Sequence, residues 1–73
     1  PVTATILAEP LGLSARELEV LEKLAKGFLL KEIADQLGVS YTTIRTYTER
    51  IYEKLHVRSR SEAAARYYQT PHQ

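Results

Sequence analysis

Three polar side chains in the stretch "YTTIRTYTERIYEKL" have hydrogen-bonding chemistry that suits the edges of nucleic-acid bases. Arg45 can donate two parallel hydrogen bonds to guanine O6 and N7, the Thr46 methyl can touch a thymine methyl, and Glu49 can accept from cytosine N4. If the stretch is helical, spacings of three and four residues bring these side chains to one side. The stretch is therefore a candidate for reading base edges in a DNA groove.

A second group of residues has the chemistry to contact the sugar-phosphate backbone. Lys31, Arg50 and Lys54 carry cations that could pair with phosphates, and Thr42 lies on the same exposed side as the base-reading candidates. The free backbone N–H groups at the start of a helix near Tyr41 would add a further anion site. Such contacts position a protein on the duplex but do not specify a sequence.

Enzymatic and metal-binding chemistry find little support in the sequence. The absence of Cys excludes disulfides, thiolate zinc sites and a cysteine nucleophile. His56 and His72 have no paired carboxylate or nucleophile arrangement nearby, and no cluster of metal ligands is present. We therefore expect neither an enzyme nor a bound cofactor or metal, and we interpret His56 as a turn residue.

Capping residues and apolar periodicity mark the first two helices that would position the polar groups. Ser14 followed three residues later by Glu17 is a capping box, and Gly27 supplies a left-handed stop, which predicts a helix over residues 15–26. The stretch "KEIADQLG" predicts a two-turn helix that ends at Gly38. Its inward side consists of Ile33, Ala34 and Leu37.

Two further helices follow. Ser40 can cap a helix over residues 41–55, whose inward stripe is Ile44, Thr48, Ile51 and Leu55. The stretch "VRSRSEAAARYYQ" offers a second capping box, Ser59 with Glu62, and Pro71 ends the helix that follows. No stretch alternates apolar and polar residues long enough for a strand, so we predict an all-α fold, a four-helix bundle.

The second and third of these helices form a helix-turn-helix. Gly38 lets the chain reverse, Ala34 is small enough for the next helix to pack closely, and Val39 fills the turn. In the DNA-binding use of this motif, the second helix lies in the major groove and the first crosses the backbone. From spacing alone, a structural hairpin with a solvated polar face explains the same pattern, because fold does not dictate function.

Length and charge describe the organisation of the chain. Its 73 residues allow one domain, and we expect residues 1–12 to be a linker from a missing upstream domain and residues 13–70 to be the domain itself. Net charge is only +1, but the basic excess lies in the second half, on the side that could meet a polyanion. No apolar run approaches the ~18 residues of a membrane span, and we expect a cytoplasmic location.

Residues spread over most of the chain carry a family resemblance. They are Leu13-Ser14, Arg16-Glu17, Glu19-Val20-Leu21, Leu24-Ala25, Gly27, Lys31-Glu32-Ile33-Ala34, Leu37, Val39-Ser40, Thr43-Ile44-Arg45-Thr46, Ile51, Lys54-Leu55, Val57 and Arg60. With them, residues 13–65 closely resemble the C-terminal DNA-binding domain of LuxR/NarL/FixJ-type bacterial transcription regulators. The resemblance implies a four-helix bundle with a central helix-turn-helix, and sequence-specific binding of double-stranded DNA as the output domain of a transcriptional regulator, such as a two-component response regulator.

The resemblance also implies partners and site residues. It places base-reading side chains at Arg45, Thr46 and Glu49, and backbone contacts at Lys31, Thr43 and Lys54. It further implies an upstream receiver or sensor domain, and a homodimer formed largely through the fourth helix, for which we expect Ala63, Arg66 and Tyr67. That helix could also close the core of its own domain, and both roles are compatible.

Four positions depart from the family pattern. Family members commonly carry a Ser or Thr and an Asn where this chain has Leu29 and Leu30, a His at Tyr47, and often a basic residue at Glu49. We expect Tyr47 to pack on the first helix, and Glu49 either to read cytosine or to orient Arg45. Our hypothesis is that Leu29 packs as a local staple, whereas Leu30 is exposed or meets another protein. Phe28 before them should belong to the core.

Two other interpretations remain. A protein-interaction module that keeps the fold but has lost DNA binding is favoured by the near-neutral charge, the two leucines and the tyrosines of the fourth helix; Lys31, Arg45, Lys54 and Arg60 disfavour it. The fourth region of sigma factors shares the Leu-Ser-x-Arg-Glu start and the Gly-Val-Ser turn. The Lys-Leu-x-Val ending followed by a fourth helix fits the LuxR type better.

Overall fold

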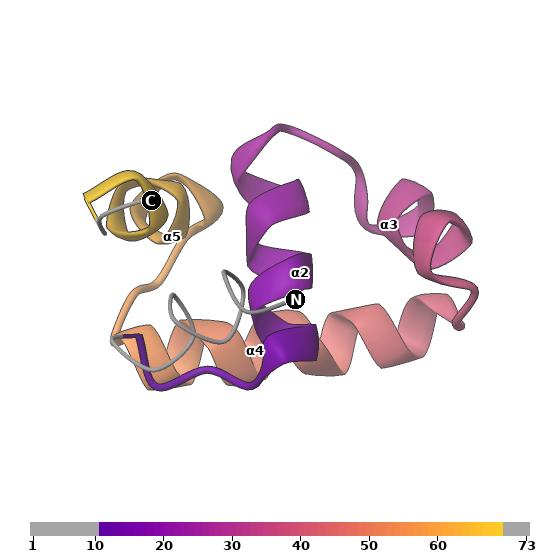
Figure 1. Cartoon of the computed structure of the whole chain (residues 1–73), viewed down its shortest axis with the longest axis horizontal. Helices are drawn as coiled ribbons and strands as arrows, with labels where there is room; N and C mark the ends of the chain where they lie inside the picture. Colours follow the sequence, from indigo (N-terminus) through magenta and orange to yellow (C-terminus); the bar gives the residue numbers. More distant parts are fainter. Residues whose placement is uncertain (1–10, 70–73) are drawn as a thin grey trace.

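The computed structural model describes residues 11–69, and four α-helices account for most of that range (Figure 1). They are α2 (Ala15–Ala25), α3 (Leu30–Leu37), α4 (Tyr41–Leu55) and α5 (Arg60–Gln69). Figure 1 shows α2 standing between α3 and α5, with α4 running beneath all three. The described residues contain no strand, so the predicted all-α class with a central helix-turn-helix is confirmed.

The predicted capping residues lie at the starts of α2 and α5, but only the capping box of α2 is complete. The Ser14 N–H donates to Glu17 Oε1 at 2.8 Å and the Glu17 N–H donates to Ser14 Oγ at 3.1 Å, which confirms the predicted capping box of α2. At α5, Ser59 Oγ accepts from the Glu62 N–H, but the Glu62 carboxylate accepts from the Arg58 N–H instead of that of Ser59. The second predicted box is therefore only half formed, because the carboxylate reaches one residue further back.

The start of α3 corrects the hypothesis about the two leucines. This helix begins at Leu30, one residue earlier than predicted, so Leu30 extends the apolar stripe of Ile33, Ala34 and Leu37 and packs half-buried against the core. Leu29 occupies the N-cap position with 53% of its surface exposed. The predicted roles were reversed: Leu30 packs, and Leu29 faces solvent.

The core lies where α2 meets the other three helices. Its fully buried large side chains are Leu18, Val20, Leu21 and Leu24 of α2, Ile33 of α3, and Ile44, Ile51 and Leu55 of α4. Leu11, which we placed in the linker, is buried in this core, so the packed unit includes Leu11. Of the other residues expected in the linker, Gly12 is described and residues 1–10 lie outside the described range. Pro71 and His72 also lie outside it.

Left-handed residues end both helices of the helix-turn-helix. Gly38 has φ 70° at the end of α3, and the next N–H, that of Val39, donates to the Ala34 carbonyl at 3.0 Å. His56 ends α4 in the same way with φ 57°, and the Val57 N–H donates to the Tyr52 carbonyl at 3.0 Å. These bonds satisfy carbonyls that a helix end leaves without partners. The interpretation of His56 as a turn residue is confirmed.

Polar side chains fasten α5 to the ends of its neighbours. Arg60 donates to the carbonyl oxygens of Leu24 and Phe28, where α2 ends and the loop to α3 begins. Arg66 Nη1 donates to the Leu55 carbonyl at 2.7 Å, at the end of α4. Because the last carbonyls of a helix lack intrahelical donors, these arginines also complement the negative ends of the helix dipoles.

Candidate nucleic-acid interface

The three base-reading candidates lie together on the exposed side of α4. Arg45, Thr46 and Glu49 are all exposed, and Arg45 Nη2 lies 3.9 Å from Glu49 Oε2. An exposed i,i+4 pair at this distance adds little to stability. The structure thus shows the contact on which the orienting role of Glu49 depends. Reading of cytosine stays a prediction.

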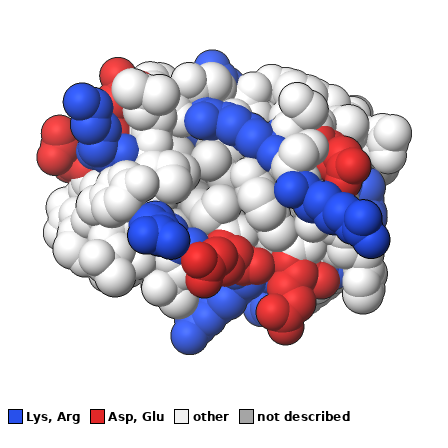
Figure 2. Space-filling view, turned by 180° about the vertical axis from the view of Figure 1, so that it is seen from behind, with Lys and Arg blue, Asp and Glu red and all other residues white. Residues whose placement is uncertain are grey.

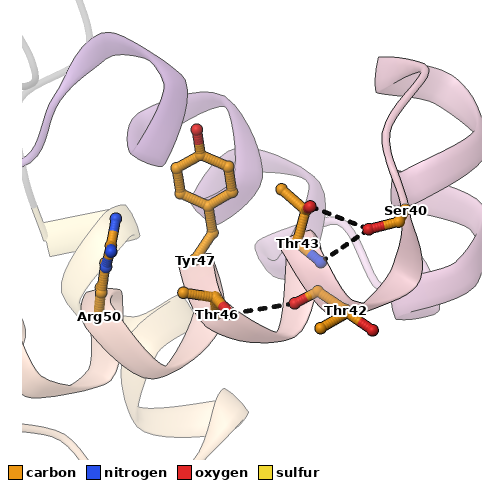
Figure 3. Close-up of a pocket in the computed structure, with 6 residues that line it drawn as sticks. All are labelled: Ser40, Thr42, Thr43, Thr46, Tyr47 and Arg50. Atoms are coloured by element: carbon orange, nitrogen blue, oxygen red, sulfur yellow. Dashed lines mark hydrogen bonds between the residues drawn. The ribbon is translucent and has the colours of Figure 1, made fainter.

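Hydroxyl groups surround the first turn of α4 (Figure 3). Ser40 Oγ accepts from the Thr43 N–H at 3.2 Å and lies 2.9 Å from Thr43 Oγ1, as expected of an N-cap. One turn later, the Thr46 hydroxyl donates to the Thr42 carbonyl at 3.1 Å. The sequence of four hydroxyl residues therefore fixes the start of the helix and leaves its polar atoms at the surface.

An open hollow of about 250 Å³ lies beside this turn. It is lined by Ser40, Thr42, Thr43, Thr46, Tyr47 and Arg50. Figure 3 shows Tyr47 and Arg50 extending from the same side of α4. The Thr42 hydroxyl, the Tyr47 phenol and the Arg50 guanidinium can donate hydrogen bonds here, so this part of the lining matches the acceptor oxygens of an anion.

Tyr47 lines the hollow and also packs against the hydrophobic core, so it is half-buried. This confirms the predicted packing role and leaves the phenol available at the edge of the hollow. The ring supplies apolar contact area while the hydroxyl keeps a polar tip, which is the usual behaviour of tyrosine at such boundaries.

Lys54 makes a contact that the local sequence pattern did not indicate. Its ammonium lies 2.8 Å from Oε1 of Glu17, whose side chain is 4% exposed, whereas that of Lys54 is 44% exposed. Burial raises the pKa of the Glu17 carboxyl, but the Lys54 ammonium and the Ser14 hydrogen bonds outweigh it, and the net pKa lies below its ordinary value. The capping box explained Glu17 locally, but 37 residues separate it from its ionic partner.

Lys31 is exposed on the first turn of α3, on the helix that precedes α4 in the motif.

Figure 2 shows the face behind the view of Figure 1, where acidic side chains lie beside several of the basic ones. That face therefore offers no broad single-sign field, and attraction of a polyanion there depends on individual cations.

The residues expected at a dimer surface have different environments. Ala63 is completely buried in the core of its own domain, so the core role that we left open is observed for this residue. Tyr67 is half-buried against the same core, and its ring meets that of Tyr68 edge-on at 5.3 Å between centroids. Arg66 is exposed and bonds to the end of α4. The dimer itself stays a prediction.

Residues 11–69 hold neither a candidate metal site nor a candidate membrane span. This range contains no group of three or more His, Cys, Asp or Glu side chains that could hold a metal ion. None of the described helices is both long enough and apolar enough to cross a membrane.

Comparison with known proteins gives a family. The family described as "Bacterial regulatory proteins, luxR family" matches residues 11–67. Similar proteins include a probable HTH-type transcriptional regulator, GfsR, of Streptomyces halstedii, which is 43% identical over 84% of this chain and 25% of its own length. The probable transcriptional regulatory protein NarL of Mycobacterium tuberculosis is 47% identical over 73% of this chain and 24% of its own length.

The transcriptional regulatory protein DesR of Bacillus subtilis is 44% identical over 84% of this chain and 31% of its own length. The chain therefore spans about a quarter to a third of these relatives. No solved structure matches the chain. The family and these relatives are regulatory proteins, which confirms the expectation that this domain is not an enzyme. The chain belongs to the luxR family of bacterial regulatory proteins.

Proposed function

We propose that this domain binds double-stranded DNA as the output domain of a transcriptional regulator, with α4 in the major groove. The observation that carries the proposal is the exposed row of Arg45, Thr46 and Glu49 on the second helix of the motif, next to a hollow lined by hydrogen-bond donors. An exposed polar helix of this kind fits the width of the major groove, where the base-edge patterns are distinct.

Phosphate contacts would fix how the domain sits on the duplex. A phosphate at the hollow beside Thr42 and Thr43 could accept from their hydroxyl groups, from Arg50 and from the Tyr47 phenol. Lys31 would reach a phosphate from the start of α3, the helix that crosses the backbone in this docking geometry. These contacts are common to all sequences, so they supply affinity and its dependence on salt.

Base recognition would then depend on Arg45. The Glu49 carboxylate can hold one side of the guanidinium, leaving its remaining N–H groups for guanine O6 and N7. A guanidinium that is already oriented loses less conformational freedom when it binds.

The larger assembly is also part of the proposal. Two copies would associate through α5, with Arg66 and Tyr67 at the surface over the buried Ala63, and would place two α4 helices about 34 Å apart on an inverted repeat. An upstream receiver or sensor domain, as in a two-component response regulator, would control this assembly in the cytoplasm. The short span of the chain relative to its relatives supports the presence of further domains in the whole protein.

The test is selection of bound duplexes from a random DNA library, followed by titration at several salt concentrations. We expect an enriched inverted repeat and an affinity whose logarithm falls with log salt by about 0.9 per phosphate contacted. Arg45→Ala should cost about 1 to 3 kcal/mol on the selected duplex and little on random DNA.

Arg16→Ala is the matched control, because Arg16 is another exposed arginine paired within its own helix, with Glu19 at 3.6 Å on α2. It should leave sequence preference unchanged. If no duplex is enriched and no salt-dependent binding is found, the alternative of a protein-interaction module, to which the exposed Leu29 would contribute, replaces this proposal.

A further inference from the structure

The pair of Glu17 and Lys54 joins a buried carboxylate to an ammonium at the surface. Glu17 Oε1 accepts both from the Ser14 N–H and from Lys54 Nζ, each at 2.8 Å. The carboxylate is fixed from behind by the α2 capping box, while the ammonium side faces solvent. In this pair the Glu17 carboxylate is buried and held by the cap, whereas the Lys54 side chain is accessible at the surface.

Helical register aligns Lys54 with the hollow. Arg50 precedes Lys54 by four residues, Tyr47 by seven and Thr43 by eleven, so all four belong to one edge of α4. Three of these residues line the hollow beside the first turn. Lys54 thus continues the same row of donors by one further turn toward the end of the helix.

The Lys54 ammonium has more N–H groups than its bond to Glu17 uses. It carries three N–H groups, of which Glu17 occupies one, so the others can reach an oxygen outside the protein. A lysine on a flexible four-carbon stem loses much rotational freedom when it binds a phosphate. Holding the ammonium in place beforehand removes part of that loss, which is the general advantage of preorganisation.

We propose that Glu17 is a positioning residue for DNA binding, which holds the Lys54 ammonium at the α4 edge so that it can bind one phosphate of the duplex backbone. The inference rests on the proposed function. The inference predicts the direction in which DNA affinity changes when the Glu17 charge is removed. A carboxylate near a polyanion weakens binding by repulsion, so removing its charge should tighten binding unless the carboxylate holds a group that contacts the DNA.

Glu17→Gln is the decisive variant, since glutamine keeps the length of the side chain and an oxygen that can accept from the Ser14 N–H, but it removes the negative charge that attracts the Lys54 ammonium. We expect it to bind random and selected duplexes about three- to tenfold more weakly than the unaltered chain. Its salt slope should fall by up to about 0.9, which is the loss of one phosphate contact. Lys54→Ala should lose the same contact, and the double variant should bind no more weakly than Lys54→Ala alone.

The matched control is Glu19→Gln, which removes the same charge from an exposed carboxylate on the same helix. It should bind as tightly as the unaltered chain or slightly more tightly. If Glu17→Gln behaves like this control, the positioning role is wrong while DNA binding stands. If the unaltered chain binds no duplex, the proposed function fails first and this inference fails with it.

A second measurement does not depend on a variant folding. In the unaltered chain, the side-chain ¹⁵N resonance of Lys54 can be followed by NMR while a random-sequence duplex is added. We expect this resonance to shift as the duplex saturates the protein. An unchanged resonance at saturation would overturn the inference, because the ammonium would then have no phosphate partner.

Discussion

The Arg60 guanidinium lies across the end of α2, where its Nε donates to the Leu24 carbonyl oxygen at 3.0 Å. The same group donates to the Phe28 carbonyl in the loop that leads to α3. One side chain of α5 thereby ties together the helix before the helix-turn-helix and the chain that enters it. The contact spans 36 residues of sequence.

Arg60→Ala should lower the free energy of unfolding by about 1 to 3 kcal/mol, because two partly buried carbonyls lose a charged donor. Arg60→Lys should recover only part of the loss, since a single ammonium lacks the planar fork that reaches both oxygens. Urea denaturation followed by circular dichroism measures both. Arg58→Ala, at an exposed arginine just before α5, is the control and should stay within about 0.5 kcal/mol; an equal loss there would contradict the capping role.

The Glu17 and Lys54 pair predicts how stability depends on pH. The pKa of Glu17 is lowered in the folded state from an ordinary value of 4.5, so the folded protein binds fewer protons than the unfolded one. The stabilising contribution is therefore fully present above pH 4.5 and is lost as pH falls through the lower folded-state pKa. Urea denaturation between pH 7 and pH 3 should show the unaltered chain losing its advantage over Glu17→Gln. A constant gap across that range would contradict the pair.

The two leucines at the start of α3, Leu29 and Leu30, should respond in opposite directions when they are replaced. Leu29→Ser supplies a hydroxyl where the helix lacks a side-chain cap, and should raise the free energy of unfolding by about 0.5 to 2 kcal/mol. Leu30→Asn removes apolar contact with the core and should lower it by about 1 to 3 kcal/mol. Thermal unfolding of the two variants measures both effects. If both changes destabilise equally, Leu29 packs after all; tighter DNA binding by Leu30→Asn would show that a phosphate contact is missing in this chain.

Glu49→Ala separates the two roles of this carboxylate. Random duplexes should bind a few-fold more tightly, because a negative charge facing the phosphates has gone. On selected duplexes, loss of preference at the guanine read by Arg45 would indicate the orienting role, and loss at a neighbouring cytosine would indicate direct reading. We expect the former. Competition titrations against single-base variants of the selected duplex measure it, and unchanged preference at both positions would exclude Glu49 from recognition.

Most of the helix pattern was predictable because it depends on residues close in sequence. The capping box of Ser14 and Glu17, the left-handed Gly38 and the bounds of α4 all agree with the structure. The reversal of Leu29 and Leu30 came from a one-residue error in where α3 begins, and one residue on a helix turns a side chain by about 100°. Local sequence patterns therefore predict where the helices lie, but an error of one residue in a helix boundary changes which side chains are expected to face the core.

The long-range polar contacts were not predictable, because they depend on how the helices pack. The sequence identified Glu17 as a capping residue and Lys54 as a phosphate contact, and nothing in their spacing joined them. Arg60 appeared as a matching residue and as one of the cations that disfavour an interaction module, although it bonds to two carbonyls. The exposed face of α4 was predictable from its period, since its inward stripe consists of Ile44, Thr48, Ile51 and Leu55.

The attachment of α5 has a consequence for how the domain opens. The buried residue of this helix is Ala63, whose side chain is a single methyl, and much of its attachment consists of hydrogen bonds from Arg60, Arg66 and Tyr68 to main-chain oxygens. Apart from Ala63 and the half-buried Tyr67, the described side chains of this helix contribute little apolar area to the core. The backbone amides of α5 should therefore exchange with solvent deuterium sooner than those of α2, because α5 should open locally more often while the rest of the domain stays folded.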